Sequence, residues 1–541
     1  MLGKLKYIPR VMMALILMMM IAMAAYTIND RRVDYDVDLG DTVVPEFTQV
    51  EVPFDQQHAD ATSLPITGSA AIDIDGDGTE ELFIGGGYQQ ENGVFKFENG
   101  SFAEVPDQAG LSKQADGTAL GALVIDHNKD SQPDMLVTHP EGIWLYTNTG
   151  GTFTAQKLDA EMNDKTTGLS IAVADVNGDG HFDMYISGYI RNELIEGLNI
   201  FNKEGYGGTS ELFINNGDNS FSNETKARGL QYLHNTFQAA FGDFEGDGDL
   251  DLIVAHDTGH VRTYLNDGTG NFTNVANPNS DLPSYPMGIG IADLNNDGLT
   301  DYSFSNIGST PPTFMVRGDL REDQPLHRKW IAFVADGKGG FTDQAEALKI
   351  ADYEFAWGMS HEDLNLDGRE DLIVSQNFVS APFHKIGWLR LPGRMLVQTA
   401  SGEMAEIGAM NGVVNRQYSI SPLTADFNGD GRPDVVHINI AGKSQAFLSQ
   451  GDTANGYLKI VLPQDVDSIG AMVEITLEDG TVLHKPYVSG EGLASDSSRV
   501  IIAGLGQQQA TSVVVRYLGG ATETQRGSFR DETLAFENPG L

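Results

Sequence analysis

The segment DIDGDGTEE, residues 73–81, holds a pattern that the chain repeats seven times. The pattern reads Asp, any residue, then Asp, Asn or Glu, any residue, Asp, a residue that is nearly always Gly, two variable residues and an acidic residue. The other copies are DHNKDSQPD from Asp126, DVNGDGHFD from Asp175, DFEGDGDLD from Asp243, DLNNDGLTD from Asp293, DLNLDGRED from Asp363 and DFNGDGRPD from Asp426. Repeats at intervals of about 50 to 70 residues predict an array of one supersecondary unit.

The repeated loop carries oxygen ligands at alternate positions. Positions 1 and 5 are Asp in all seven copies, and position 9 is acidic in all seven. Calcium takes six to eight oxygen ligands, and a cation would relieve the repulsion of about 1–4 kcal/mol between each close pair of carboxylates. Position 7 has no shared side chain, so its backbone carbonyl is the expected ligand. Position 6 is Gly in six copies and Ser131 in the second, and Gly permits the positive φ of a tight turn.

The sequence therefore predicts about seven Ca²⁺ ions. The predicted ligands, with position 7 acting through its carbonyl, are Asp73, Asp75, Asp77, Thr79, Glu81, Asp126, Asn128, Asp130, Gln132, Asp134, Asp175, Asn177, Asp179, His181, Asp183, Asp243, Glu245, Asp247, Asp249, Asp251, Asp293, Asn295, Asp297, Leu299, Asp301, Asp363, Asn365, Asp367, Arg369, Asp371, Asp426, Asn428, Asp430, Arg432 and Asp434. Polar turns without metal are the alternative, chiefly for the Asp126 loop, which lacks the Gly.

The residues around the loops indicate strands rather than helices. An EF-hand needs a Glu at position 12 and two flanking helices, but position 12 is not acidic in any copy. Short apolar runs such as DMLVTH and DLIVAH follow the loops and are typical of buried strands. Each ion should therefore lie in a turn between two strands, with position 9 opening the second strand.

A second motif closes most repeats: a Tyr or Phe strand, an Asn-Gly or Asp-Gly turn, and a Phe-Thr strand. Examples lie at 95–105, 145–156, 212–224, 264–275 and 333–344, and they predict hairpins. About four strands per repeat predict an all-β, seven-bladed β-propeller. Residues 46–54 resemble the end of a repeat but precede the first loop, so we expect them to pair as the outer strand of the last blade.

These motifs resemble the FG-GAP/VCBS repeats of integrin α-subunit propellers and bacterial surface proteins, and more closely the cartilage acidic protein family. After residue 450, the strands YLKIVLP, RVIIAGLG and VVVRYLGG resemble the ASPIC/UnbV domain of that family. The segment GEGLASDSS departs from the family pattern. The resemblance implies structural calcium loops and a role in adhesion or assembly rather than catalysis.

The N-terminus is typical of an export segment. Lys4, Lys6 and Arg10 precede an uncharged stretch at 11–28, and Ala22-Met23-Ala24 fits a cleavage site. The stretch predicts either a cleaved signal or a hydrophobic helix that stays as a membrane anchor; a buried core helix is the third alternative. The expected divisions are 1–28 for this segment, 29–45 for a linker, 46–450 for the propeller, 451–525 for the small C-terminal β-domain, and 526–541 for a tail.

Composition limits the partners and the chemistry. The chain has 76 acidic and 34 basic residues and a formal charge of −42, so a nucleic-acid partner is not expected. It has no cysteine, which excludes disulfides and thiolate chemistry. No catalytic motif such as Gly-x-Ser-x-Gly or His-Glu-x-x-His is present, so no catalytic residue is predicted.

Recognition is expected in the insertions at 187–211, 305–330 and 376–418, because loops on a rigid scaffold commonly carry binding sites. The basic segment HKIGWLRLPGR stands out, and its candidate anchors for a protein or glycan are His384, Lys385, Trp388, Arg390 and Arg394. The alternative is an internally neutralised loop that packs over the propeller. The preferred hypothesis is an exported calcium-binding module for adhesion, surface assembly or ligand binding. The alternatives are an accessory subunit anchored to an envelope complex and a carbohydrate-active enzyme of the lyase or dehydratase type.

Overall fold

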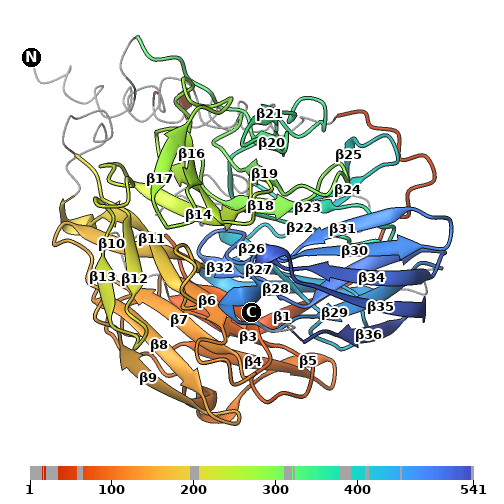
Figure 1. Cartoon of the computed structure of the whole chain (residues 1–541), viewed down its shortest axis with the longest axis horizontal. Coiled ribbons are helices and arrows are strands. Elements are labelled where there is room, and N and C mark those ends of the chain that lie inside the picture. The colour runs from red at the N-terminus through yellow and green to blue at the C-terminus, as the bar shows by residue number, and fades with distance from the viewer. Residues whose placement is uncertain are drawn as a thin grey trace, which may run out of the picture.

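The structure is a computed structural model that describes residues 15, 18–19, 35–57, 65–194, 206–309, 320, 323–376, 391–408, 413–450 and 454–537. The described residues form an all-β fold in which seven sheets repeat one four-stranded antiparallel unit (Figure 1). Short 3₁₀ turns connect some strands: η2 (Pro106–Gly110), η3 (Asn192–Leu194), η7 (Val466–Ser468) and η8 (Leu518–Gly520). The predicted all-β class and the repeated unit are confirmed.

Each repeated sheet runs in chain order from its first strand outward. The first strands are β2 (Ser69–Ile72), β6 (Gly121–Ile125), β10 (Thr166–Ala174), β14 (Thr236–Gly242), β18 (Ile289–Ala292), β22 (Ala356–Glu362) and β26 (Ser419–Ala425). The second strands are β3 (Glu81–Ile84), β7 (Asp134–His139), β11 (Asp183–Ile190), β15 (Asp251–His256), β19 (Asp301–Phe304), β23 (Asp371–Gln376) and β27 (Asp434–Asn439). All fourteen of these strands are largely buried, because both of their faces pack against neighbouring sheets.

The outer strands form the predicted hairpins. The third strands are β4 (Gly93–Glu98), β8 (Gly142–Asn148), β12 (Glu211–Asn215), β16 (Val261–Asn266), β20 (Ile331–Ala335), β24 (Arg394–Gln398) and β28 (Ala441–Gln450). The fourth strands are β5 (Ser101–Glu104), β9 (Phe153–Lys157), β13 (Phe221–Asn223), β17 (Phe272–Val275), β21 (Phe341–Asp343) and β25 (Met404–Glu406). Strands β24 and β25 lie inside the stretch 376–418, which the sequence analysis treated as an insertion.

The last repeated sheet is closed by the N-terminal strand. β1 (Glu46–Gln57) pairs antiparallel with β28, from Glu46 opposite Gln450 to Gln57 opposite Ala441. The first strands also contact one another in chain order, and β26 returns to β2. The described sheets therefore form a closed, propeller-like ring, and the expected pairing of residues 46–54 is confirmed.

The C-terminal domain consists of two further sheets around its own apolar core. One has the order β33 (Ile501–Gly506), β29 (Gly456–Val461) and β36 (Glu532–Ala535); the other has the order β31 (Val482–Pro486), β30 (Met472–Leu477), β34 (Ala510–Arg516) and β35 (Thr522–Phe529). The prediction of a tail from residue 526 is wrong. β36 pairs in parallel with β29, and Leu534 and Phe536 are buried in the domain core.

A segment of the C-terminal domain, residues 489–499, enters the middle of the ring. Its short strand β32 (Ser495–Asp496) pairs in parallel with β2, and Figure 1 shows β32 among the first strands of the repeats. The amide of Gly492 donates to the carbonyl of Ile289 at 2.8 Å, and the amide of Ala494 donates to the side-chain oxygen of Gln238 at 3.0 Å. We call residues 489–499 the central segment. It joins the two parts of the chain through hydrogen bonds to several sheets.

Two sets of expectations fall largely outside the described residues. Apart from residues 15, 18 and 19, the export segment at 1–28 is not described, and neither is the linker before residue 35. Within the described residues, no helix has the length and apolar character needed to cross a membrane. Of the five candidate anchors, His384, Lys385, Trp388 and Arg390 also lie outside the described residues.

Candidate metal centre

The seven repeated loops each join the first and second strands of one sheet, so they gather at one face of the ring. In every copy the position 9 carboxylate is the first residue of the second strand, as predicted. Every loop is also closed by the same hydrogen bonds. In the third copy, Oδ1 of Asp175 accepts from the amide of Asp179 at 3.0 Å, and Oδ2 accepts from the amide of Gly180 at 2.7 Å.

The corresponding bonds from positions 5 and 6 to position 1 occur in the other six copies, at 2.7–3.2 Å. In all seven copies the position 5 carboxylate accepts from the amide of position 7, at 2.9–3.4 Å. These bonds bring positions 1, 3 and 5 to one side of each loop.

The position 9 carboxylate fixes the loop to the sheet. In the fifth copy, Oδ2 of Asp301 accepts from the amide of Leu294 at 2.9 Å, and Oδ1 accepts from the amide of Ala335 at 2.8 Å. The first bond recurs in all seven copies. The second recurs in five of the other six, and the exception is the copy that ends in Glu81. Each carboxylate oxygen has a second lone pair available for a cation.

Backbone conformation explains the Gly pattern. Position 6 has a positive φ in every copy, from 65° at Ser131 to 94° at Gly248, as predicted. Position 4 also has a positive φ in every copy, which the sequence analysis missed. The signal was present, because position 4 is Gly in four copies. In the Asp126 loop both positions carry side chains, Lys129 at 57° and Ser131 at 65°, so this loop has the most strained backbone of the seven.

Burial makes these carboxyls costly to ionise without a cation. Burial, helped by nearby carboxylates of the same loops, raises the pKa of Asp134, Asp183, Asp251 and Asp301 to about 7. Burial likewise raises the pKa of the position 1 carboxyls Asp73, Asp126, Asp243 and Asp293. A divalent cation would stabilise the ionised form of each loop. The donor set, made of hard oxygen ligands at alternate positions, fits Ca²⁺.

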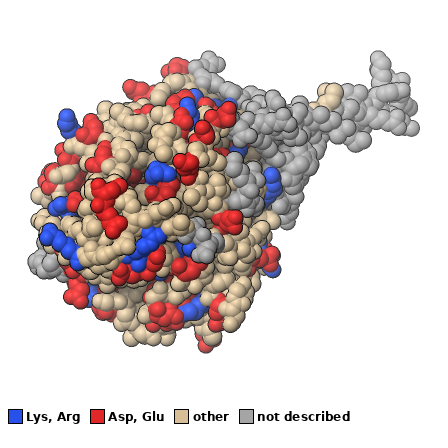
Figure 2. All heavy atoms as spheres, turned by 90° about the vertical axis from the view of Figure 1, so that its right-hand side faces the viewer, with Lys and Arg blue, Asp and Glu red and all other residues tan. Residues whose placement is uncertain are grey.

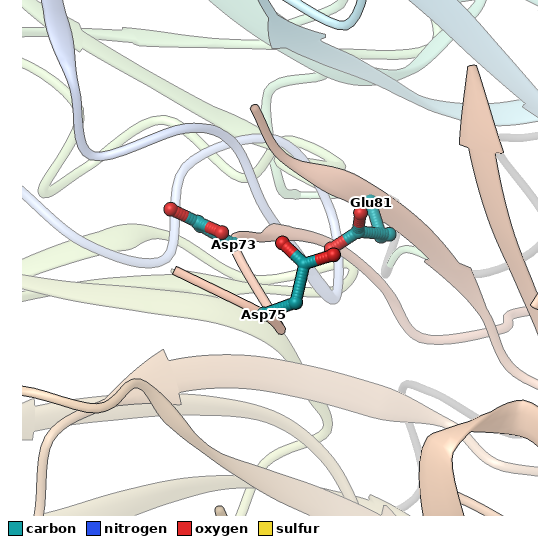
Figure 3. A group of neighbouring side chains, drawn as sticks. All are labelled: Asp73, Asp75 and Glu81. Atoms are coloured by element: carbon teal, nitrogen blue, oxygen red, sulfur yellow. The ribbon is translucent and has the colours of Figure 1, made fainter. Parts of the chain in front are cut away.

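The first loop brings three carboxylates close together. One carboxylate oxygen each of Asp73, Asp75 and Glu81 lies within 4.8 Å of the other two. Figure 3 shows Asp75 between the other two carboxylates, with its oxygens turned toward Glu81. This spacing is compatible with one ion contacting all three residues.

The C-terminal domain covers the loop face of the ring. The amide of Gly504 donates to Oδ2 of Asp363 at 3.0 Å, and Nζ of Lys459 lies 3.0 Å from Oδ2 of Asp426. In another loop, Lys129 forms an ion pair of 2.6 Å with Asp467 of the domain. On the molecular face shown in Figure 2, acidic and basic side chains are intermixed rather than separated into patches. The predicted metal loops are therefore also contact points between the two parts of the chain.

Arg394, the one candidate anchor that is described, does not lie on an exposed surface. It opens β24 and is 6 % exposed. Its Nη2 lies 2.6 Å from Oε1 of Glu354, and its guanidinium carbon lies 4.9 Å from the ring centre of Tyr353. The buried ion pair accounts for this arginine, so in the described fold it is a packing residue and not a surface anchor.

Comparisons with known proteins agree with the repeat geometry. A family model for an FG-GAP-like repeat matches residues 73–137, 126–186, 200–254 and 243–302, and a model for ASPIC and UnbV matches residues 463–540. The chain is an FG-GAP repeat protein with a C-terminal ASPIC and UnbV domain. The loops at Asp363 and Asp426 lie beyond the matched repeats, yet they have the same hydrogen bonds as the matched copies. The ASPIC and UnbV match also includes β36, in agreement with the corrected domain boundary.

Cartilage acidic protein 1 of Homo sapiens is 25% identical over 451 residues, which cover 78% of this chain and 61% of that protein. The same protein of Xenopus tropicalis is 22% identical over 515 residues, 89% of this chain and 75% of that protein. This chain thus spans less than two thirds of the human relative. Among solved structures, the V. cholerae biofilm matrix protein Bap1 aligns with a TM-score of 0.41 and 11% identity, over 85% of this chain and 100% of that chain.

Proposed function

We propose that this chain is an exported, calcium-binding propeller of seven blades that presents a recognition surface for adhesion or ligand binding. The observation that carries the proposal is the recurrence of one hydrogen-bonded loop in all seven sheets, with buried carboxylates at fixed positions. Such loops are costly to keep ionised without a cation. Calcium bound at each loop would fix the turn between the first two strands and so stabilise the ring.

The strand order indicates where recognition would occur. The second strand of each sheet begins at the loop face and ends at the opposite face. The connections after Ile190, Phe304 and Gln376 therefore leave the described structure at the face away from the C-terminal domain. These connections belong to the three long insertions. Because the domain occupies the loop face, the insertions are the better candidates for contact with a protein or glycan partner.

Similarity to cartilage acidic protein 1 and to a T-cell immunomodulatory protein homolog of Plasmodium falciparum, 25% identical over 230 residues, supports an extracellular role. Those residues cover 38% of this chain and 30% of that protein. The basic residues before residue 11 and the apolar stretch at 11–28 support export. Neither family model describes an enzyme, which favours a binding module over a lyase or dehydratase.

Metal counting combined with thermal unfolding tests the calcium proposal. We expect about seven Ca²⁺ per chain and a large fall in melting temperature when the ions are chelated, because each ion adds roughly 1.4 kcal/mol at ten times its dissociation constant. The variant Asp297→Asn should lose one ion. The matched control Asp267→Asn removes an exposed carboxylate from the β16–β17 hairpin and should lose none. Fewer than three ions, or no change on chelation, would refute the proposal.

A further inference from the structure

A lysine reaches into the first calcium loop. Nζ of Lys96 lies 2.8 Å from Asp75, 2.7 Å from Asp77 and 2.9 Å from Glu81. These three carboxylates are at positions 3, 5 and 9, which are predicted calcium ligands. An ammonium group has three N–H donors, so it satisfies all three carboxylates at once. The lysine therefore occupies the electrostatic position of the cation.

Strand register shows that this lysine is special to the first sheet. Phe95 pairs with Leu82, which places Lys96 beside Glu81. The residues in the same register position of the other six sheets are Thr147, Ile214, Leu265, Val334, Val397 and Leu448. All six are uncharged, so the position beside the position 9 carboxylate carries a cation in one repeat.

The first loop also differs in its own charge. Position 3 is Asp75 here, whereas five of the other six copies have Asn at that position. Position 9 is Glu81 here and Asp in the others. In the others, the second oxygen of position 9 accepts a strand amide, but Oε1 of Glu81 faces Lys96 instead. The extra carboxylate, the longer side chain and the lysine therefore occur together in one loop.

We propose that Lys96 is a built-in counter-ion of the Asp73 loop that competes with Ca²⁺ for the same carboxylates. This inference rests on the calcium function proposed above. Calcium needs its oxygens at about 2.3–2.6 Å, and an ammonium among the same oxygens would be repelled by the ion. The ammonium must therefore move away when calcium binds. Its four-carbon stem is flexible, and its side chain is 26% exposed, so it has a route to solvent.

The consequence is a loop that stays folded at low calcium and binds the ion more weakly than its four carboxylates suggest. The lysine lowers the pKa of Asp77 through a hydrogen bond and its charge, while its own pKa is raised by the three carboxylates. Without calcium, Lys96 therefore reduces the repulsion among the carboxylates of this loop and stabilises the first sheet. Within the described residues, Asp367 and Asp426 pair with Arg369 and Lys459. In the Asp126, Asp175, Asp243 and Asp293 loops, no described Lys or Arg forms an ion pair with a predicted ligand.

The test compares Lys96→Met and Lys96→Gln with the matched control Lys443→Met. Lys443 is a half-exposed lysine on β28, outside the calcium loops, so its variant has the same change in charge. Each full-length protein is depleted of calcium and then titrated with calcium in competition with a chromophoric chelator. Melting temperatures are recorded with chelator and with saturating calcium. In the parent, calcium binding must break the attraction between the ammonium and three carboxylates at 2.7–2.9 Å. Losing this attraction predicts at least a tenfold difference in calcium affinity at one site.

We expect both Lys96 variants to bind calcium at least tenfold more tightly at one site, and to melt below the parent in chelator but level with it in calcium. Adding Asp73→Asn should abolish the tightened site, which assigns it to this loop. If parent and variants bind several calcium ions with identical affinities, the role of Lys96 is refuted while the calcium function stands. If none of the proteins binds calcium, the proposed function itself fails.

Discussion

The substitution Asp301→Asn tests the electrostatics of the loops most directly. Asp301 is fully buried at position 9, and burial raises its pKa from 3.8 to about 7. Without calcium, the folded protein therefore keeps this proton up to about pH 7, whereas the unfolded chain loses it above pH 3.8. The group accordingly contributes stability at acid pH that is lost as pH rises from about 4 to 7. Asparagine cannot ionise, so the stability of the variant should not fall with pH for this reason.

The size of the effect follows from the pKa difference. Between pH 5 and pH 7 this carboxyl is ionised in the unfolded chain but protonated in the folded parent, so each pH unit lowers the free energy of unfolding by about 1.36 kcal/mol. From pH 5 to pH 8 the parent therefore loses about 2.7 kcal/mol of stability relative to the variant. A cooperative unit of roughly 500 residues has an unfolding entropy near 1 kcal/mol/K. The melting temperature of the parent should thus fall by about 2–3 °C relative to the variant over that range.

The assay is thermal unfolding of calcium-depleted parent and variant at pH 5, 6, 7 and 8. Buried histidines such as His361 and His437, whose pKa burial lowers to about 4, titrate equally in both proteins and cancel in the difference. The side-chain amide of the Asp301→Asn variant would also lie beside the backbone N–H groups of Leu294 and Ala335. Any cost of this contact is the same at every pH, so it does not affect the comparison of the two pH profiles. With saturating calcium the parent should be the more stable protein at pH 8, because the variant has lost an ionised ligand. Parallel pH profiles without calcium would refute the reasoning.

Three further outcomes are expected. Ser131→Gly should raise the melting temperature and tighten calcium binding at its loop, because it removes about 1 kcal/mol of strain at a φ of 65°; Ser131→Ala, which keeps a Cβ, should do neither. Arg394→Met should destabilise the protein by about 3–5 kcal/mol in urea unfolding, because it leaves Glu354 buried without its ion pair, and adding Glu354→Gln should recover part of the loss. Deleting residues 46–54 should lower the melting temperature by many degrees, because β28 loses its outer partner; an unchanged value would contradict this role for β1.

Local chemistry made the repeated unit predictable. The loop pattern marks the end of one strand and the start of the next, since position 9 is the first residue of the second strand in every copy. The Asn-Gly and Asp-Gly turns mark the outer hairpins for a similar reason, because only certain residues adopt the backbone angles of those turns. The closure of the ring by residues 46–54 was also predictable, because the sequence from Phe47 to Val50 resembles the end of a repeat.

Features that depend on distant partners could not be predicted in this way. Arg394 looked like a surface anchor because nothing in its own segment reveals Glu354, 40 residues earlier. The central segment showed in the sequence only as GEGLASDSS, a departure from the family pattern, because its hydrogen-bond partners are distant: Gln238 lies 256 residues from Ala494 in the chain. Lys96 sits within an ordinary hairpin motif, and its relation to Glu81 appears only when the strand register is known.

The two faces of the ring have separate roles in this architecture. At the loop face, Asp363 and Asp426 each give one oxygen to the C-terminal domain, through Gly504 and Lys459, and are also predicted to bind calcium. In the proposed function, ion binding and domain docking therefore share atoms, so removal of calcium would change the charge beside the C-terminal domain. The connections after Ile190, Phe304 and Gln376 start from the opposite face, and their described residues include no predicted calcium ligand. A partner held there should depend on calcium through the stability of the ring and not through direct contact with the metal.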